Sequence, residues 1–442
     1  MSKSIYINQK IKSFRKKIFV SGDKSLSIRF ALMASQAIGK SRIYNLLNSE
    51  DVLSALHCLK KVGVKSKNKK NYCEIYGNGL NGFSFKNKTV INCQNSGTLA
   101  RLICGLLAKS TKSVILKGDK SLSKRDFSRI IKPLNLFGIK IKSKNNKLPL
   151  KIMGTNYLRP IKWYEMLKSA QVKTSILLAS LNTPGVTEIH ALKSRDHSER
   201  LFKFLKIPIS IKKKKEFDLI KIKGQHQYKS FVAKVPGDIS SASFFILLAL
   251  LSKDSEIIIK NVNVNKTRTG IIDILKKMNA KIKIKNHKML NGEEIADINV
   301  KHSEKLKAIK PSPLINSRAI DELPLIFLAC SKAQGVSYFR DLGELRNKEQ
   351  DRLKFSAKFL KMIGIKIVET KNSLKIYGNP KLYLEGKYVV KNFMKDHRAF
   401  MMSVVAALSL GGKWKIYDPD SIKTSFPSFL NKIRKLGAKL HQ

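Results

Sequence analysis

The sequence predicts an α/β protein of two similar domains, each assembled from three copies of one supersecondary unit. The first observation behind this prediction is an ending that occurs six times, in which an amphipathic run closes on a turn-forming residue and a short basic strand follows. These endings lie about 70 to 85 residues apart, and so regular a period indicates one repeated structural unit. The residues that mark the endings are Gly63, Gly138, Ile207, Asn279, Gly364 and Gly437.

The second observation is that each unit contains two predicted helix starts. The first helix of each unit begins in a small polar or charged turn, at Ser25, Asn95, Ser169, Ser240, Asp321 and His397. The second helix begins near Asp51, Asp126, Asp196, Arg268, Glu349 and Thr424. Helix N-termini bind anions because they present free backbone N–H groups and a partial positive charge. The same residue types also serve as ordinary N-caps, so a single start does not identify a site.

Within a unit the pattern reads strand, helix, strand, helix, strand, strand. The first helices, such as residues 242–251, are apolar on most faces and are therefore predicted to be buried. The second helices, such as residues 352–362, are amphipathic and are predicted to cover the outside. Basic segments of period two, such as residues 140–143, predict half-exposed strands at the end of each unit.

The third observation concerns the last unit, which starts near Asp396 and has too few residues for its closing strands. Because residues 1–20 contain strand-like pieces, the N-terminal segment is predicted to complete this unit. The predicted domains are residues 21–234, which are contiguous, and residues 1–20 plus 235–442. Two crossings between the domains make a natural hinge, and ligands favour clefts between domains, so the active site is expected in the interdomain cleft.

Composition restricts the classes of function. The net charge of the 442 residues is +56, which favours an anionic partner. The lysines are spread along the chain without a nucleic-acid-binding motif, so specific nucleic-acid binding is not expected, whereas a small anionic ligand remains open. The longest apolar run, residues 244–251, is too short for a membrane span of about 20 residues. Five cysteines without paired spacing favour reduced thiols in the cytoplasm and no metal site.

A phosphate or carboxylate cradle is predicted at the first helix start. Ser25 and Arg29 are four residues apart, hence on one helix face, and Lys24 stands at the entrance. Here the sequence resembles the 3-phosphoshikimate 1-carboxyvinyltransferase (EPSP synthase) family, and the resemblance covers nearly the whole chain. The other segments that carry it, in the family's order, are residues 95–101, 124–125, 169–173, 194–200, 235–242, 320–324, 344–352, 396–398 and 424–427.

The resemblance implies two domains, each of three βαβαββ units around a pseudo-threefold axis. The implied reaction is an addition-elimination that transfers the enolpyruvyl group of phosphoenolpyruvate to the 5-hydroxyl of shikimate 3-phosphate and releases phosphate. This step belongs to the shikimate route to chorismate and aromatic amino acids. No metal or organic cofactor is expected. The expected protein is a cytoplasmic monomer whose two domains close on their substrates.

The resemblance also implies roles for individual residues. Those that would bind shikimate 3-phosphate are Lys24, Ser25, Arg29, Ser169, Ala170 (through its backbone), Gln171, Arg195, Asp321 and Lys348. Those that would bind phosphoenolpyruvate are Lys24, Gly97, Arg125, Gln171, Arg352 and Arg398. Asp321 is the implied general base and Glu349 the implied general acid, with Lys24 assisting.

Several alternatives remain open from the residues alone. Asp321 also fits a carboxylate that stabilises its own helix N-terminus, and Glu349 also fits an ion pair with a neighbouring cation. Asn95 and Lys423 are kept apart from the binding sets. For Lys423 the reason is that many family members have a lysine where Thr424 stands, and Lys423 lies one residue earlier. A related transferase acting on UDP-N-acetylglucosamine shares the fold but usually has Lys-Asn in place of Lys24 and Ser25. A basic nucleic-acid-binding protein is the rival from another class.

Overall fold

The computed structural model describes residues 3–441, whose strands form six small sheets. Contacts divide the chain into two units. Unit 1 comprises Met1–Ser21, Pro236–Met289 and Glu294–Gln442, and unit 2 comprises Gly22–Val235 and Leu290–Glu293.

The structure places the short segment Leu290–Glu293 in unit 2, whereas the sequence predicted it in the other domain, which comprises residues 1–20 plus 235–442. It is the turn of a hairpin, and its contacts are with unit 2. The Gly292 carbonyl accepts a hydrogen bond from Arg200 Nη1 at 3.3 Å, and Glu293 Oε1 lies 2.7 Å from His197 Nδ1. A buried contact between two side chains and a hydrogen bond to a main-chain carbonyl therefore decide the placement of this turn, and local patterning does not encode either of them.

The three sheets of unit 2 share one topology, which agrees with the repeated βαβαββ unit. In each sheet, taken in spatial order, the first two strands are parallel, the third strand pairs antiparallel with the second, and the fourth pairs antiparallel with the third. The sheets, in spatial order, are β6 (Thr89–Asn92), β7 (Val114–Lys117), β9 (Lys147–Met153), β8 (Lys140–Lys144); β10 (Lys162–Glu165), β11 (Val186–Leu192), β13 (Phe217–Lys223), β12 (Ile209–Lys213); and β14 (Val232–Lys234), β3 (Ile38–Tyr44), β5 (Tyr72–Asn78), β4 (Lys65–Asn68).

In unit 1 one sheet repeats this four-stranded order, whereas the other two sheets have three strands each, and the strands come from both ends of the chain. Its sheets are β2 (Arg15–Phe19), β15 (Glu256–Asn263), β17 (Glu293–Lys301), β16 (Ile282–Leu290); β18 (Val336–Phe339), β20 (Leu374–Tyr377), β19 (Ile367–Glu369); and β21 (Leu384–Val390), β22 (Gly411–Tyr417), β1 (Ser4–Ile7). β1 pairs antiparallel with β22, so the N-terminal segment completes the last βαβαββ repeat, as predicted. β2 pairs parallel with β15, a second role that the sequence did not predict.

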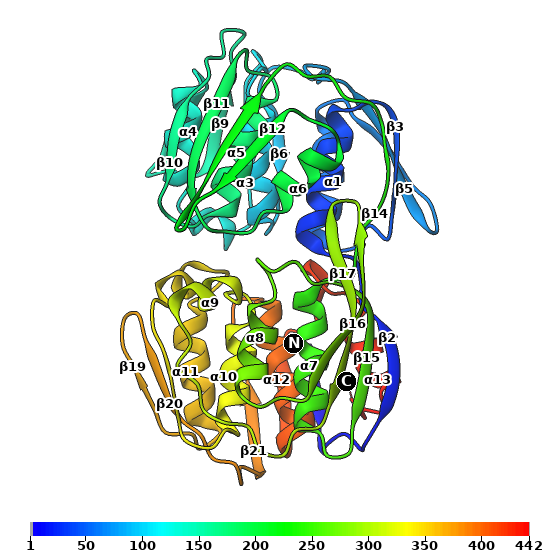
Figure 1. Ribbon diagram of the computed structural model, residues 1–442, viewed down its shortest axis with the longest axis vertical. Helices are drawn as coiled ribbons and strands as arrows, with labels where there is room; N and C mark the ends of the chain where they lie inside the picture. Colours follow the sequence, from blue (N-terminus) through cyan, green and yellow to red (C-terminus); the bar gives the residue numbers. More distant parts are fainter. Residues whose placement is uncertain (1–2, 442) are drawn as a thin grey trace. The chain divides into compact units, whose positions relative to one another are not determined.

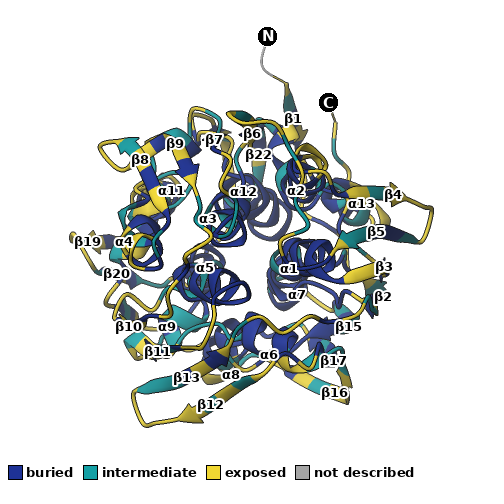
Figure 2. Ribbon diagram, turned by 90° about the horizontal axis from the view of Figure 1, so that it is seen from above, coloured by how far each residue is buried: buried dark blue, intermediate teal, exposed yellow. Residues whose placement is uncertain are grey.

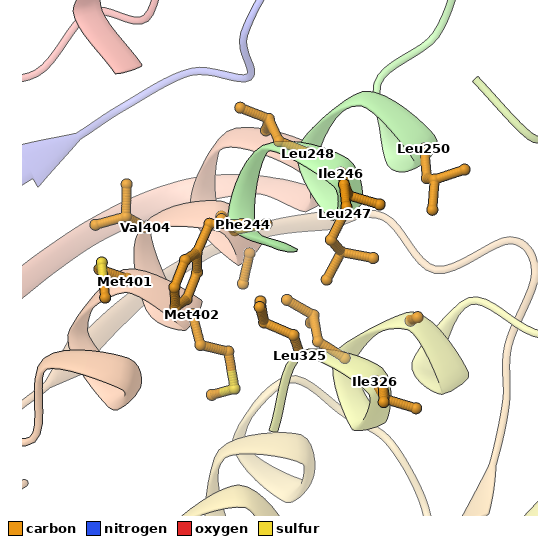
Figure 3. Close-up of a cluster of buried hydrophobic side chains, with 14 of the residues drawn as sticks. Phe244, Ile246, Leu247, Leu248, Leu250, Leu325, Ile326, Met401, Met402 and Val404 are labelled. Atoms are coloured by element: carbon orange, nitrogen blue, oxygen red, sulfur yellow. The ribbon is translucent and has the colours of Figure 1, made fainter. Parts of the chain in front are cut away.

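The first helix of each repeat is buried, as predicted. These inner helices are α1 (Lys24–Gln36), α3 (Gly97–Leu106) and α5 (Ala170–Ser180) in unit 2, and α7 (Ile239–Leu251), α10 (Leu323–Ser331) and α12 (His397–Leu410) in unit 1. α7, α10 and α12 lie side by side, and their side chains, among them Phe244, Leu325 and Met402, form one apolar cluster (Figures 1 and 3). Figure 2 shows the inner helices as buried and the strands around them as partly exposed.

The second helices are amphipathic and lie outside the inner ones. They are α2 (Glu50–Lys61), α4 (Ser128–Leu136), α6 (His197–Phe204), α8 (Gly270–Lys277), α11 (Arg352–Met362) and α13 (Phe429–Lys435). The second residue after five of them has the predicted left-handed conformation, with φ of +90° at Gly63 and +69° at Asn279. In the third repeat this conformation falls on Lys206 (φ +58°) instead of Ile207, because a β-branched residue strongly disfavours positive φ.

The last predicted helix start is also displaced. Residues Pro419–Thr424 form the 3-10 turn η3, and α13 begins at Phe429 after Ser428. Thr424 therefore closes a tight turn and does not open a helix. Two further short helices, α9 (Pro313–Arg318) and the 3-10 turn η2 (Gly343–Asn347), interrupt the repeat in unit 1.

Three other features bear on function. Among residues 3–441, no helix has the length and apolar character that crossing a membrane requires. The five cysteines are buried and form no disulfide. In the same part of the chain no group of three His, Cys, Asp or Glu side chains is arranged to hold a metal ion.

We predict that Gly105→Ala separates α3 from α5. A Cβ at this position would lie 2.0 Å from the Ser175 carbonyl oxygen on the facing helix. Alanine is intrinsically favoured over glycine in a helix by about 1 kcal/mol, so a loss of stability would show that packing decides. We expect the free energy of unfolding, measured by urea denaturation, to fall by about 1–3 kcal/mol.

Gly343→Ala is the matched control for this variant. A Cβ there would meet only the side-chain oxygen of Asn372, at 2.9 Å, and that side chain is free to move. We expect a change within about 0.5 kcal/mol. Unchanged or increased stability of the Gly105→Ala protein would show that the two helices tolerate a wider separation.

Candidate functional site

The start of α1 fixes a lysine against the start of α2. The Asp23 carboxylate caps α1 by accepting a hydrogen bond from the Leu26 N–H at 2.9 Å. Lys24 Nζ lies 2.8 Å from Asp51 Oδ2 in the first turn of α2, and the two side chains are only 17% and 8% exposed. Because both partners are largely shielded from water, the ammonium group has a defined position at the junction of two helix starts.

Arg29 connects α1 with the starts of α5 and α6. Its buried guanidinium donates to Ser198 Oγ at 2.9 Å, to Thr174 Oγ1 at 3.2 Å and to the Ser25 carbonyl at 3.0 Å. The two hydroxyl groups also contact each other at 2.7 Å. Ser25 and Arg29, which the sequence predicts on one helix face, are therefore held together by a direct hydrogen bond.

Gln171 connects α5 with α3. Its Oε1 accepts from Arg101 Nη1 at 3.0 Å, and its Nε2 donates to Thr98 Oγ1 at 3.1 Å. A Cβ at Gly97 would come within 2.7 Å of Arg125 Nη1 and 2.9 Å of Arg101 Nη1. Glycine at this helix start therefore lets two guanidinium groups approach the backbone closely.

Asn95 orients one of these arginines. Its Oδ1 accepts from Arg125 Nη2 at 3.3 Å, while its Nδ2 donates to Asp119 Oδ2 at 2.7 Å. The amide is thus fixed from both ends, and its oxygen is turned toward the guanidinium. Asn95 contacts a predicted ligand of phosphoenolpyruvate, which accounts for an amide at this position.

The turn that starts α5 is built around a buried carboxylate. Glu165 Oε1 accepts hydrogen bonds from the backbone N–H groups of Leu167, at 2.9 Å, and Ser169, at 3.2 Å. Lys168 has a left-handed conformation (φ +54°) in this turn, and Ser169 caps the helix by accepting from the Val172 N–H. Burial raises the pKa of Glu165, although its hydrogen bonds act in the opposite direction.

The predicted residues of unit 2 thus occupy helix starts that are linked by hydrogen bonds. Ala170 opens α5, and Arg195 stands just before α6. Lys173 and Glu199, both buried, form an ion pair of 2.5 Å between these two helices. Cationic side chains and free backbone N–H groups at several helix starts make this part of unit 2 a candidate anion-binding surface.

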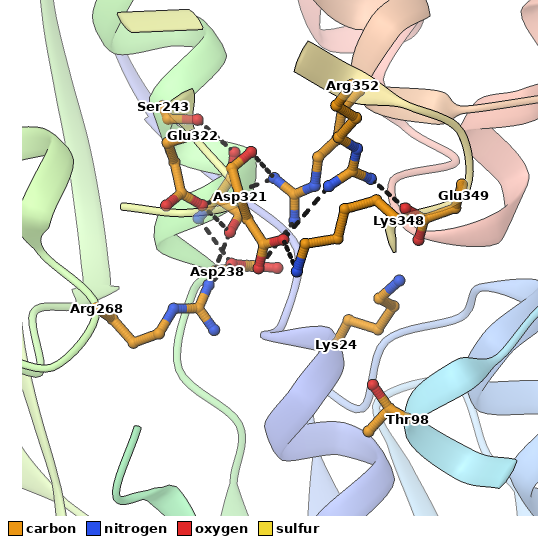
Figure 4. A network of polar contacts seen from close by, with 12 residues as sticks. Lys24, Thr98, Asp238, Ser243, Arg268, Asp321, Glu322, Lys348, Glu349 and Arg352 are labelled. Carbon is orange, nitrogen blue, oxygen red and sulfur yellow. Dashed lines mark hydrogen bonds and ion pairs between the residues drawn. The ribbon is translucent and has the colours of Figure 1, made fainter. Parts of the chain in front are cut away.

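In unit 1 the predicted residues gather around the carboxylate of Asp321 (Figure 4). Asp321 Oδ1 lies 3.4 Å from Arg352 Nη1 and 3.8 Å from Lys348 Nζ. Arg398 Nη2 lies 3.9 Å from Oδ2, and Arg398 Nη1 donates to the Asp321 main-chain carbonyl at 3.1 Å. Three cations therefore surround one carboxylate that is itself only 16% exposed.

Arg352 is the most buried cation of this cluster. Its Nε donates to Asp396 Oδ2 at 2.8 Å, and its Nη2 donates to Glu349 Oε2 at 2.5 Å. Burial alone would lower the pKa of this guanidinium, but the negative charges of Asp396 and Glu349 outweigh it and raise the pKa above its ordinary range. Arg352 is consequently a permanent positive charge, and Asp396 fixes its orientation.

Lys423 has a different environment from the other predicted cations. Its side chain is 54% exposed and pairs with Asp420 at 2.7 Å within the turn η3. The neighbouring Thr424 Oγ1 lies 3.2 Å from His397 Nδ1 at the start of α12. The threonine therefore contacts an inner helix here.

Sequence reasoning missed the side chains that hold the predicted ligands. They are Asp51, Thr98, Arg101, Thr174, Ser198, Glu322 and Asp396. Most of them lie within or beside the motif segments, and their short spacing from the predicted residues was the available signal. Their partners come from other helices, which no local pattern reveals.

Comparison with known proteins gives one consistent result. The sequence profile of the family described as EPSP synthase (3-phosphoshikimate 1-carboxyvinyltransferase) matches residues 8–433. The 3-phosphoshikimate 1-carboxyvinyltransferase of Ruthia magnifica is 40% identical over 427 residues, covering 96% of this chain and 95% of that protein. That of Zymomonas mobilis is 37% identical over 438 residues, covering 98% and 96%.

Solved structures agree with these relatives. EPSP synthase from Acinetobacter baumannii superposes with a TM-score of 0.86 at 32% sequence identity, covering 99% of each chain. The enolpyruvyl transferase NikO from Streptomyces tendae superposes with a TM-score of 0.77 at 14% identity, covering 100% of this chain and 99% of NikO. At that identity the second likeness shows the fold alone.

We predict that Glu165→Gln removes the contribution of this side chain to the pH dependence of the free energy of unfolding. Because the pKa of Glu165 is raised in the folded state, the folded protein gains stability from this group as pH falls through that pKa, and the gain is complete below its ordinary value of 4.5. Glutamine keeps the accepting oxygen but does not titrate. In urea denaturation from pH 4 to 8, the stability of the variant relative to the unaltered protein should be highest at pH 8 and fall toward pH 4.

Glu165→Ala is the control, because it removes the accepting oxygen as well as the charge. We expect it to lower the free energy of unfolding by about 1–3 kcal/mol at every pH. A constant difference between Glu165→Gln and the unaltered protein across the pH range would contradict a raised pKa.

Proposed function

This chain belongs to the EPSP synthase family, and from that premise we propose which of its residues bind the substrates and which move protons. Its activity is that of a 3-phosphoshikimate 1-carboxyvinyltransferase in the shikimate pathway, on the enolpyruvyl transferase fold. The enolpyruvyl group of phosphoenolpyruvate passes to the 5-hydroxyl of shikimate 3-phosphate, and phosphate leaves. Both substrates carry several negative charges, so their binding requires fixed cations and backbone N–H groups.

We assign shikimate 3-phosphate to the helix starts of α1, α5 and α6, together with two residues of unit 1. Its ligands in this proposal are Lys24, Ser25, Arg29, Ser169, Ala170, Gln171, Arg195, Asp321 and Lys348. The support is that Arg29 and Gln171 are held in fixed orientations by Ser198, Thr174, Arg101 and Thr98. Side chains already ordered in this way lose little conformational entropy when a ligand binds.

We assign phosphoenolpyruvate to Lys24, Gly97, Arg125, Gln171, Arg352 and Arg398. A guanidinium meets a carboxylate or phosphate with two parallel hydrogen bonds, so three arginines suit a small ligand that carries both groups. Asn95 and Asp396 support the assignment, because they orient Arg125 and Arg352 respectively.

The observation that carries the catalytic assignment is the carboxylate of Asp321 within 4 Å of Lys348, Arg352 and Arg398. In the addition step Asp321 accepts the proton of the 5-hydroxyl as that oxygen bonds to the central carbon of phosphoenolpyruvate. Glu349 gives a proton to the methylene carbon, with Lys24 assisting. In the elimination step the new methyl group returns a proton to the Glu349 carboxylate, the carbon–carbon double bond re-forms, and the carbon–oxygen bond to phosphate breaks.

Glu349 and the substrate share one cation in this scheme. Arg352 donates to Glu349, Asp396 and Asp321, so an anion that binds Arg352 competes with Glu349 for the guanidinium. Binding of phosphoenolpyruvate would in this way release the Glu349 side chain from Arg352 and leave it available to the substrate.

We also propose that ligands from both units act on the same pair of substrates and that the units close around them. The support is chemical, because neither unit alone contains the full set of proposed cations and acids. The protein would act as a cytoplasmic monomer, and specific nucleic-acid binding has no part in the scheme.

We predict that the protein releases phosphate from phosphoenolpyruvate only when shikimate 3-phosphate is present. Asp321→Asn and Glu349→Gln should each lower kcat about a hundredfold to ten-thousandfold, because each removes a proton-transfer group. A colorimetric phosphate assay at saturating substrates measures these rates.

The control is Glu304→Gln, which removes an exposed carboxylate of unit 1. Its rate should equal that of the unaltered protein. Phosphate release without shikimate 3-phosphate would contradict the reaction, and near-normal rates of the Asp321 and Glu349 variants would contradict only their assigned roles.

We predict that shikimate 3-phosphate makes the protein more compact. Cations that belong to one substrate site but lie on two units repel each other until an anion neutralises them, so closure should follow binding. Small-angle scattering with and without ligand measures the radius of gyration, and the same data should give the mass of one 50.0 kDa chain. An unchanged radius would contradict closure, and a doubled mass would contradict a monomer.

A further inference from the structure

A chain of buried polar groups joins four helix starts of unit 1 (Figure 4). Arg268, just before α8, donates from Nη2 to Ser240 Oγ at 2.7 Å in the first turn of α7. Ser240 Oγ in turn donates to Glu322 Oε1, at the start of α10. The same Glu322 oxygen lies 3.6 Å from Arg398 Nη1, in the first turn of α12.

The members of this chain are almost completely shielded from water. Glu322 is 0% exposed and Arg268 is 2% exposed, and Asp238, which lies 3.6 Å from Arg268 Nη2, is buried as well. Removing charges of this kind from water costs several kcal/mol per ion, and well-packed apolar residues in their place are often as stable or more stable. Stability alone therefore gives no reason for four polar groups at this position.

What the chain does provide is a fixed position for one guanidinium. Arg398 Nη1 is held from two directions, by the Asp321 main-chain carbonyl at 3.1 Å and by Glu322 Oε1 at 3.6 Å. Because Asp321 and Glu322 are adjacent in sequence, the same short segment of main chain positions both the Asp321 carboxylate and the groups that hold Arg398. Ser240 and Arg268 restrict Glu322 from its far side, so its oxygen has little freedom to turn away from Arg398.

We propose that Glu322 is a positioning residue for phosphoenolpyruvate binding. It holds Arg398 in the orientation that the substrate anion requires, and Arg268 and Ser240 hold Glu322. This inference rests on the proposed function, in which Arg398 is a ligand of phosphoenolpyruvate. It gives a role to Arg268, whose position in its βαβαββ repeat corresponds to helix starts that we assign to substrate binding in other repeats.

The test compares the KM for each substrate in Glu322→Gln. Glutamine keeps the size of the side chain and an oxygen that accepts from Ser240, but it removes the negative charge that attracts Arg398. We expect the KM for phosphoenolpyruvate to rise roughly five- to fiftyfold, the range of coupling between contacting charged residues. The KM for shikimate 3-phosphate should change by less than about twofold, as expected for a residue that acts only through Arg398.

A double-mutant cycle shows whether Glu322 acts through Arg398. In an Arg398→Met background, which lacks the guanidinium, the further change Glu322→Gln should alter kcat/KM for phosphoenolpyruvate by no more than about twofold. An effect of Glu322→Gln that is equally large with and without Arg398 would overturn the proposal. So would equal rises of both KM values, because they would indicate general disruption of the unit.

Two further variants keep the test decisive. Ser331→Ala removes a buried hydroxyl that bonds the Leu328 carbonyl at the other end of α10, and it should leave both KM values unchanged. If Glu322→Gln does not fold, Ser240→Ala decides the question. This variant keeps the charge of Glu322 but removes the hydroxyl group that restricts its side chain. It should raise the KM for phosphoenolpyruvate about two- to fivefold. Unchanged KM values in Ser240→Ala would then overturn the proposal.

The unaltered protein separates this inference from the proposed function. If the unaltered protein fails to release phosphate with both substrates present, the proposed function is wrong, and the proposed role of Glu322 is wrong as well. If it is active and Glu322→Gln has a normal KM for phosphoenolpyruvate, only the positioning role is wrong.

Discussion

Packing of three apolar helices against one another is the interaction on which each unit depends. α7, α10 and α12 are buried nearly throughout their length, and they contact one another in one apolar cluster. Their polar first turns meet at one end, as the contacts from Arg268 through Ser240 and Glu322 to Arg398 demonstrate. Helix packing therefore collects free backbone N–H groups and charged side chains in one place, which is the requirement for binding a small anion.

The two units use this arrangement differently. In unit 2 the collected side chains are mainly cations and neutral hydroxyl or amide groups, such as those of Arg29, Thr174 and Gln171. In unit 1 the acids Asp321, Glu349 and Asp396 are interleaved with arginines. Unit 2 is consequently suited to neutralising charge, whereas unit 1 holds the carboxylates that we propose for proton transfer.

Much of the fold could be predicted from the sequence because the residues that signal each repeat are close together in the chain. Apolar runs, polar helix starts and left-handed caps are each visible within a few residues, and all six buried helices begin where such signals stand. The failures lie where distant residues decide. The pairing of β2 with β15 is one case, and the left-handed Lys206 in place of Ile207 is another.

The sequence proposes the ligands of the candidate site, but it does not reveal the side chains that hold them. Motifs placed Arg352, Arg398 and Asp321 on helix starts, yet the carboxylates of Asp396 and Glu322 that orient the arginines became apparent only in three dimensions. Supporting contacts join residues that are 44 to 77 positions apart, and no periodicity links such pairs.

The pairing of β1 with β22 has a consequence for how the protein is made. Ile5 stands opposite Ile416, so the sheet they share has to wait until the ribosome has added more than four hundred residues between its two strands. The long stretch Gly22–Val235, by contrast, is available as soon as residue 235 has emerged. Domains generally fold as units in the order of their synthesis. A growing chain therefore carries one nearly finished unit while β1 still waits for β22, its partner strand in the other unit.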